Sequence, residues 1–130
     1  MNAQQRKLRQ LDYIEHMVKA IRLVQSYVEG MSREEFLVDK KTQQAVVLNI
    51  LILGEAATQV CKEYPEWADR HPAVPWRAMR GMRNRLAHGY FEINLDVVWD
   101  TVQQSLAELE EKLRVVLKDA SPDLHGGAVP

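Results

Sequence analysis

Hydrophobic residues recur at intervals of three and four along most of the chain. Between Leu8 and Val28 this spacing predicts one amphipathic helix with a broad buried face, and Gly30 after it predicts the helix end. The same periodicity predicts a long last helix, capped by Asn94 and reaching about Lys118. The predicted core stripes are Leu11, Ile14, Met17, Val18, Ile21, Val24 and Val28 in the first helix, and Val98, Val102, Leu106, Leu109, Leu113 and Val116 in the last.

Two capping signals divide the segment that follows the first helix. Ser32 with Glu35 three residues later is a capping box, which predicts a short helix ending near Val38. Asp39 then caps a second long helix, from about Lys40 to Glu63. The centre of this helix, residues 45–53, is apolar nearly all round. It must therefore be covered on several faces, and a second subunit is one possible source of that cover.

A shorter helix is predicted after a proline-rich connection. Pro65 breaks the second long helix, and the chain to Val74 reads as a connection. Pro75 suits the first position of the next helix. Its inward stripe is Trp76, Met79, Met82 and Leu86, with Arg83 at the edge.

The whole pattern predicts an all-α fold, an antiparallel bundle of four to five helices. No internal repeat, low-complexity block or strand-like alternation interrupts it. Residues 1–118 are predicted to form one helical domain, and residues 119–130, with two prolines and a Gly-Gly pair, a flexible C-terminal tail.

Charge is nearly balanced overall but not locally. The net charge of the 130 residues is −1, which excludes a polycation that binds nucleic acid indiscriminately. Between Arg70 and Tyr90, however, there are five arginines and no acidic residue: Arg70, Arg77, Arg80, Arg83 and Arg85. This patch suggests a specific anionic partner, although a solvated arginine face is the plainer alternative.

A soluble, cytoplasmic protein is expected. Cys61 is the only cysteine and has no disulfide partner within the chain, which fits a reducing compartment. The N-terminal residues lack the apolar core of a signal peptide. The longest apolar run, residues 45–53, is far shorter than the roughly 20 residues of a membrane span.

The densest candidate chemistry lies at the end of the shorter helix, where Gly89 is expected to stop it in a left-handed conformation. On an ideal helix Arg83 and His88 diverge by about 140°. They converge only if the helix ends between them or if a second subunit completes the site. Structural alternatives remain for each residue: His88 as a capping residue, Arg83 extending past the apolar stripe, and Tyr90 with the following residue as a core anchor.

Arg83, His88 and Tyr90 match the Arg-x4-His-x-Tyr signature of HEPN-domain ribonucleases, and residues 82–91 resemble its HepT toxin branch. Asn84 agrees with the polar residue that often follows the arginine in HEPN motifs. The resemblance spans roughly Leu8 to Leu117. Beyond the motif it rests on Asp39, Gly54-Glu55-Ala56, Val74-Pro75-Trp76 and Asp96-Val97-Val98-Trp99.

This resemblance implies a metal-independent endoribonuclease that needs no cofactor. In the family, a ribose 2′-hydroxyl attacks the adjacent phosphate within a homodimer. Histidine suits proton transfer near neutral pH and arginine suits the developing phosphate charge, so His88 and Arg83 are the expected catalytic residues. Asn84 is expected to orient the phosphate or an adjacent histidine, and Arg80 and Arg85 are expected to bind the phosphate. Glu55, beside an apolar run, is expected to pair with a motif arginine as a supporting residue.

The HepT branch also implies a partner. Its toxins pair with MNT-type nucleotidyltransferase antitoxins, which transfer an adenylyl group to the motif tyrosine, here Tyr90. That role requires an exposed hydroxyl. Two other functions remain open: a non-catalytic HEPN module that binds nucleotides or assists a nucleotidyltransferase, and a helical dimerisation scaffold whose basic patch only docks a partner.

Overall fold

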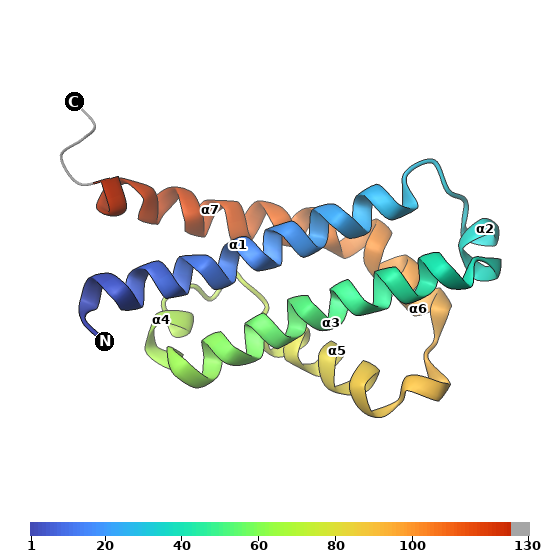
Figure 1. Cartoon of the computed structure of the whole chain (residues 1–130), viewed down its shortest axis with the longest axis horizontal. Coiled ribbons are helices and arrows are strands. Elements are labelled where there is room, and N and C mark those ends of the chain that lie inside the picture. Colours follow the sequence, from blue (N-terminus) through green and yellow to red (C-terminus); the bar gives the residue numbers. More distant parts are fainter. Residues whose placement is uncertain (126–130) are drawn as a thin grey trace.

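Three long helices form the frame of the protein, as the computed structural model shows (Figure 1). They are α1 (Ala3–Val28), α3 (Lys40–Glu63) and α7 (Leu106–His125). Helix α1 packs against both α3 and α7 and runs antiparallel to each. The shorter α5 (Trp76–His88) packs against α3. Helix α3 is therefore covered by α1 on one side and by α5 on another.

The structure describes residues 1–125, apart from the side chains of Tyr90 and of residues 121–125. Within that range there is no strand, so the all-α prediction is confirmed. Short elements join the long helices: α2 (Arg33–Val38), α4 (Pro65–Asp69), the 3-10 turn η1 (Tyr90–Glu92), α6 (Leu95–Asp100) and the π-helical turn η2 (Thr101–Ser105).

Three helix starts, those of α2, α3 and α6, are set by side chains that the sequence predicted, whereas α1 begins at Ala3, capped by Asn2, and not at the predicted Leu8. Ser32 accepts a hydrogen bond from the Glu35 amide at 3.1 Å, and the Glu35 carboxylate accepts one from the Ser32 amide at 2.9 Å. Asp39 accepts from the amide of Thr42 at 3.0 Å, and Asn94 caps α6 in the same way. Each bond satisfies an amide that the first turn of a helix leaves without a partner.

The core is one continuous apolar cluster between α1, α3, α5 and the last helices. Both predicted core stripes are buried along their whole length. Among the described residues the one buried polar side chain is Asn49, whose amide donates to the Ala45 carbonyl at 2.9 Å. Of the described helices, α3 alone is long and apolar enough to cross a membrane, and half of its most apolar stretch is buried in the bundle. Core helices of globular proteins share that property.

The connection before α5 contains a helix that was not predicted. Pro65 does end α3, but it also opens α4, because a proline in the first turn loses no helical hydrogen bond. The indole N–H of Trp76 donates to the carbonyls of Ala68 and His71, both at 3.1 Å, which ties α4 to the start of α5. Pro75 is the cap of α5 rather than its first residue.

The last predicted helix is not uniform, and it ends later than expected. Val98, Val102 and Leu106 follow one another at steps of four, so the stripe advances about 40° per step around an ordinary helix. The π-helical turn η2 widens the helix at this point and keeps all three residues buried.

Helix α7 continues to His125, beyond the predicted end at Lys118. Pro122 lies in its last turn, where one missing backbone hydrogen bond does not stop the helix, and the first glycine pair comes only after it. Residues 119–125 of the predicted flexible tail are thus helical. Residues 126–130 lie outside the described residues, so flexibility there stays a prediction.

Candidate active site

A close crossing of α3 and α5 at Gly54 positions the motif arginine. A methyl group placed on Gly54 would lie 2.9 Å from the Met79 carbonyl and 3.1 Å from the Cγ of Arg83. Both separations are shorter than ordinary van der Waals contact. The missing side chain of Gly54 therefore lets α5 pack close enough to place Arg83 directly against α3.

Arg83 is held by a carboxylate from α3. Its Nε donates to Oε2 of Glu55 at 3.0 Å, and its Nη2 lies 2.9 Å from the same oxygen. Its Nη1 donates to the side-chain oxygen of Asn84 at 2.9 Å. The predicted pairing of Glu55 with a motif arginine is confirmed as a contact. These bonds use three of the five guanidinium N–H groups, which leaves two for an anion.

A second α3 residue, Gln59, fixes the carboxylate. Its amide donates to the other oxygen of Glu55 at 3.0 Å. This hydrogen bond is the largest influence that lowers the pKa of Glu55 below its ordinary value of 4.5; burial opposes it and the Arg83 charge reinforces it. Glu55 is therefore ionised at neutral pH, and Arg83 faces a fixed negative charge.

His88 is exposed and is the last residue of α5. The helix does not end between Arg83 and His88, so the two side chains diverge by about 140° within one chain. No described hydrogen bond joins them, and the contact of Asn84 is with Arg83 rather than with the histidine. One chain alone therefore does not bring the two expected catalytic groups together.

Gly89 ends α5 for a different reason from the predicted one. Its φ is −114°, and among the described residues the only glycine with positive φ is Gly30, at 73°. A Cβ on Gly89 would lie 2.9 Å from the Arg85 carbonyl, which accepts the Gly89 amide at 2.9 Å. Close approach to the last turn, rather than a left-handed conformation, is what favours glycine here.

The other arginines of α5 form a basic surface around the pair. Arg77, Arg80 and Arg85 are exposed, and none of them forms an ion pair with a described carboxylate. Arg85 makes a weak contact, with its Nη2 3.9 Å from the sulfur of Met82. Their positive charges are thus open to an anionic ligand.

Tyr90 follows α5 in the turn η1, but its side chain lies outside what the structure describes. The predicted exposure of its hydroxyl therefore stays a prediction. Its neighbour Phe91 is 99% exposed.

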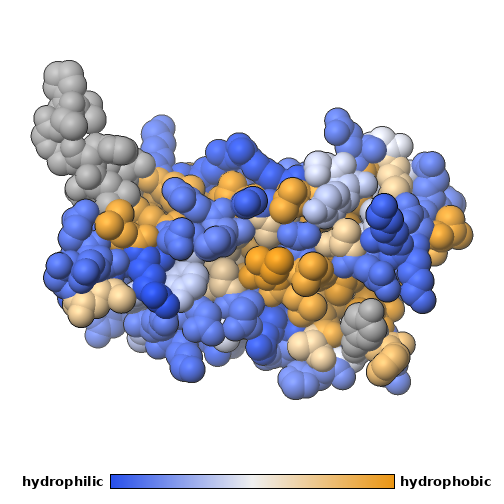
Figure 2. Space-filling view, in the orientation of Figure 1, coloured by the Kyte–Doolittle hydropathy of each residue, from blue (hydrophilic) through white to orange (hydrophobic). Residues whose placement is uncertain are grey.

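An open apolar strip on α3 leads to the Glu55–Arg83 pair. Leu48, Ile52, Glu55 and Gln59 lie at steps of four, three and four, so they share one face of α3. Leu48 is 56% exposed and Ile52 41%, and Figure 2 shows apolar surface gathered in this part of the molecule. We call Leu48, Leu51 and Ile52 the α3 strip.

Sequence reasoning missed Gln59 and the packing role of Gly54, whereas it did expect extra cover over the apolar run that contains the α3 strip. The signal for the strip was the apolar run of residues 45–53. This part of the helix is apolar on more sides than the other helices of one chain can cover. No comparable signal marked Gln59, and Gly54 was noted only as part of the Gly54-Glu55-Ala56 resemblance. For metals, the described residues contain no group of three or more His, Cys, Asp or Glu side chains suited to hold an ion.

Comparison with known proteins gives a consistent match. A model of the family "Ribonuclease HepT-like" matches residues 17–116. The chain is 39% identical over 106 residues to a Thermococcus cleftensis protein named "Probable ribonuclease HepT", covering 79% of this chain and 94% of that protein. A candidate RNase of Caldanaerobacter subterraneus is 34% identical, covering 82% of this chain and 92% of that protein. Another from Methanocaldococcus jannaschii is 35% identical, covering 83% and 84%. No solved structure gives a significant match.

Proposed function

Because this chain belongs to the HepT-like ribonuclease family, we propose that it is an endoribonuclease and the toxin of a toxin–antitoxin pair. The observation that carries the proposal is the fixed guanidinium of Arg83. It is oriented by Glu55 and Asn84, and it lies in a basic surface on the same helix as the exposed His88. A fixed cation with free N–H groups is what a developing phosphate charge requires.

The proposed reaction uses the substrate's own nucleophile. The ribose 2′-hydroxyl attacks the adjacent phosphorus, the bond to the 5′-oxygen breaks, and a cyclic phosphate remains. One histidine takes the proton from the 2′-hydroxyl, and a second gives a proton to the leaving oxygen. Arg83 stabilises the charge on the phosphate oxygens. These roles need no metal ion, since the protein groups supply both the proton transfer and the positive charge.

One chain supplies a single motif histidine, so the proposal includes a two-fold homodimer. In a two-fold interface the same patch of both subunits meets, and two histidines and two arginines would line one cleft. The α3 strip supports this arrangement, because it is apolar, open and continuous with the Glu55–Arg83 pair. A second copy on this strip would also cover the face of α3 that the bundle leaves exposed.

We propose that an MNT-type nucleotidyltransferase is the antitoxin and transfers an adenylyl group to Tyr90, in the cytoplasm. Tyr90 follows His88 by two residues, so an attached nucleotide would occupy the space beside the catalytic groups. Its phosphate would occupy the place of the substrate phosphate and would repel RNA.

The test compares the purified chain with two histidine variants on a labelled single-stranded RNA, with EDTA present. His88→Ala is expected to abolish cleavage. His16→Ala, a matched control at an exposed position on α1, is expected to leave it unchanged. RNA with a 2′-deoxy sugar at the cleavage site is expected to resist cleavage. Undiminished cleavage by His88→Ala would exclude the mechanism, whereas ATP binding with RNA left intact by the unaltered protein would favour a non-catalytic role.

A further inference from the structure

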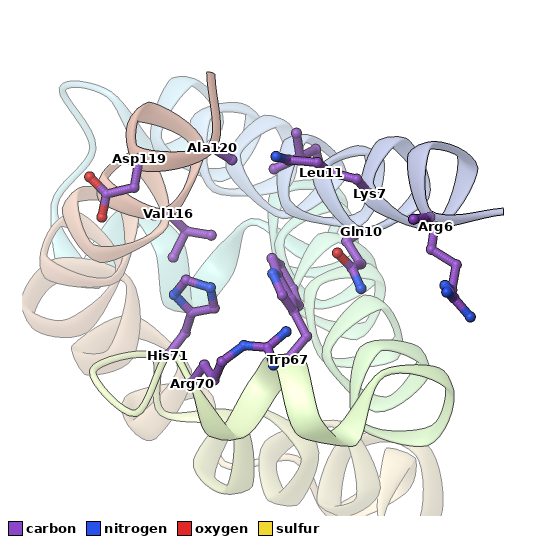
Figure 3. Close-up of a pocket in the computed structure, with 11 residues that line it drawn as sticks. Arg6, Lys7, Gln10, Leu11, Trp67, Arg70, His71, Val116, Asp119 and Ala120 are labelled. Atoms are coloured by element: carbon purple, nitrogen blue, oxygen red, sulfur yellow. The ribbon is translucent and has the colours of Figure 1, made fainter. Parts of the chain in front are cut away.

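A polar pocket lies at the end of the bundle where α1 begins and α7 ends (Figure 3). Its volume is about 460 Å³. Trp67, Arg70 and His71 line it from α4 and the residues that follow, and Arg6 and Lys7 line it from α1. It thus combines an aromatic ring with several positively charged groups.

This pocket is separate from the Arg83 site. The hydrogen bonds of Trp76 tie α4 to the start of α5, whereas His88 is the last residue of that helix. Helix α5 has 13 residues, so its first and last residues lie about 18 Å apart at a rise of 1.5 Å per residue. Part of the pocket also lies outside residues 17–116, the segment that matches the family, because it includes Arg6 and Asp119. The pocket therefore joins residues inside the matched segment, Trp67, Arg70 and His71, to residues outside it.

Trp67 is held in place as an aromatic platform. Its ring lies 4.9 Å from the ring of His71 in an edge-on arrangement and 6.3 Å from the ring of Trp76. Figure 3 shows the indole standing in the pocket, with Gln10 reaching towards it from α1. Trp67 as a whole is partly buried and packs against the core. Partly open aromatic rings of this kind are what nucleic-acid bases stack on in proteins that bind single strands.

The described lining of the pocket holds one acidic side chain, Asp119, together with the arginines Arg6 and Arg70. Arg6 and Arg70 are exposed, and neither forms an ion pair with a described carboxylate. Burial lowers the pKa of His71 and the nearby Arg70 charge lowers it further, while Asp119 opposes them. The imidazole is therefore neutral at neutral pH, with one donor and one acceptor nitrogen, and the guanidinium groups supply the positive charge.

We propose that this pocket binds one nucleotide unit, with its base against Trp67 and its phosphate at Arg70. Arg6 at the rim adds attraction for the anion. That the unit is part of an RNA strand rests on the proposed ribonuclease function; a free nucleotide offers the same chemistry. If RNA is the source, the pocket anchors the strand near the opposite end of α5 from His88.

Binding is measured by fluorescence anisotropy with a short labelled 2′-O-methyl oligoribonucleotide, which lacks the attacking hydroxyl and stays whole. Arg70→Gln is expected to weaken binding about tenfold, through loss of a charged hydrogen bond to phosphate. Trp67→Leu is expected to weaken it by a similar factor, through loss of stacking. Arg22→Gln is the matched control, since it removes an exposed arginine of α1 outside this pocket, and it is expected to bind normally.

The same variants are titrated with AMP to identify the source of the nucleotide unit. Loss of oligonucleotide binding with no measurable AMP binding assigns the pocket to RNA, and parallel loss of AMP binding assigns it to a free nucleotide. Arg70→Gln is exposed, so it also tests the proposal if Trp67→Leu unfolds. The proposal is overturned if Arg70→Gln binds both the oligonucleotide and AMP with unchanged affinity. If the same variant binds the nucleotidyltransferase more weakly, the pocket is a protein-binding site instead. None of these outcomes depends on whether His88→Ala abolishes cleavage.

Discussion

Gly54→Ala is expected to destabilise the protein and to impair cleavage together. The added methyl group would lie 2.9 Å from the Met79 carbonyl, which is backbone and cannot rotate away. It would also press on the Arg83 side chain, so α5 has to move outward. Overpacking of this kind costs about 1–3 kcal/mol, against which alanine gains up to about 1 kcal/mol in helix propensity. The net loss is expected to be about 1–2 kcal/mol.

Gly81→Ala is the matched control, because it makes the same change on α5 without the clash. Its methyl group would meet only the end of the Arg85 side chain, at 3.5 Å, an ordinary contact. The gain in helix propensity should therefore appear undiminished, and the free energy of unfolding should rise by about 0.5–1 kcal/mol. The two glycine-to-alanine changes thus have opposite predicted signs.

Urea unfolding followed by circular dichroism measures both stabilities, and cleavage of labelled RNA measures activity. For a domain of this size, a change of 1 kcal/mol in the free energy of unfolding corresponds to about 4 °C in Tm. In thermal melts Gly54→Ala should therefore have a lower Tm than the unaltered protein, and Gly81→Ala a higher one. Gly54→Ala should also lose activity under conditions where it remains folded. A Gly54→Ala protein as stable and active as the unaltered chain would refute the argument that this crossing positions Arg83.

Three further predictions follow from the same structure. The double variant Leu48→Lys/Ile52→Lys should be a monomer in analytical ultracentrifugation and should not cleave RNA. The control Val115→Lys, at an exposed position of α7, should remain dimeric and active. A monomer that still cleaves RNA would contradict the composite site. Glu55 has a lowered pKa, so its ion pair should stabilise the fold above about pH 4.5 and stop doing so as pH falls through the lowered value. Glu55→Gln should therefore lower the free energy of unfolding by less than about 1 kcal/mol at pH 7, because both partners are partly exposed, and by less in acid. The variant should also cleave RNA more slowly. An equal loss of stability at all pH values would exclude this pairing. His71 also has a lowered pKa, so stability should fall as pH drops below 6.5, and His71→Gln should flatten that slope in thermal melts; an unchanged slope would contradict the burial of the ring.

Local signals in the chain predicted the starts of α2, α3 and α6 correctly, because each depends on residues within one turn. Ser32, Asp39 and Asn94 cap helices as expected, since the side chain and the amide that it satisfies are three residues apart or fewer. The stripe of α5 was also predicted, with Met79 and Leu86 buried. Errors occurred where a local signal was ambiguous. Pro65 both ends one helix and begins another.

The candidate site was predicted in its residue types but not in its geometry. Arg83 and His88 were identified from spacing, and the pairing of Glu55 from its apolar surroundings. That Gln59 fixes the same carboxylate depends on where α5 crosses α3, and no local pattern encodes the crossing point.

By itself the sequence determined the long helices, their buried faces and the family motif, because periodicity, capping and motif spacing are properties of neighbouring residues. Only the tertiary structure decided that Gly54 brings Arg83 against Glu55 and that α5 continues through His88. It also decided that Trp67, Arg70 and Arg6 share one pocket. These relations join residues far apart in the chain, and they follow from how whole helices pack.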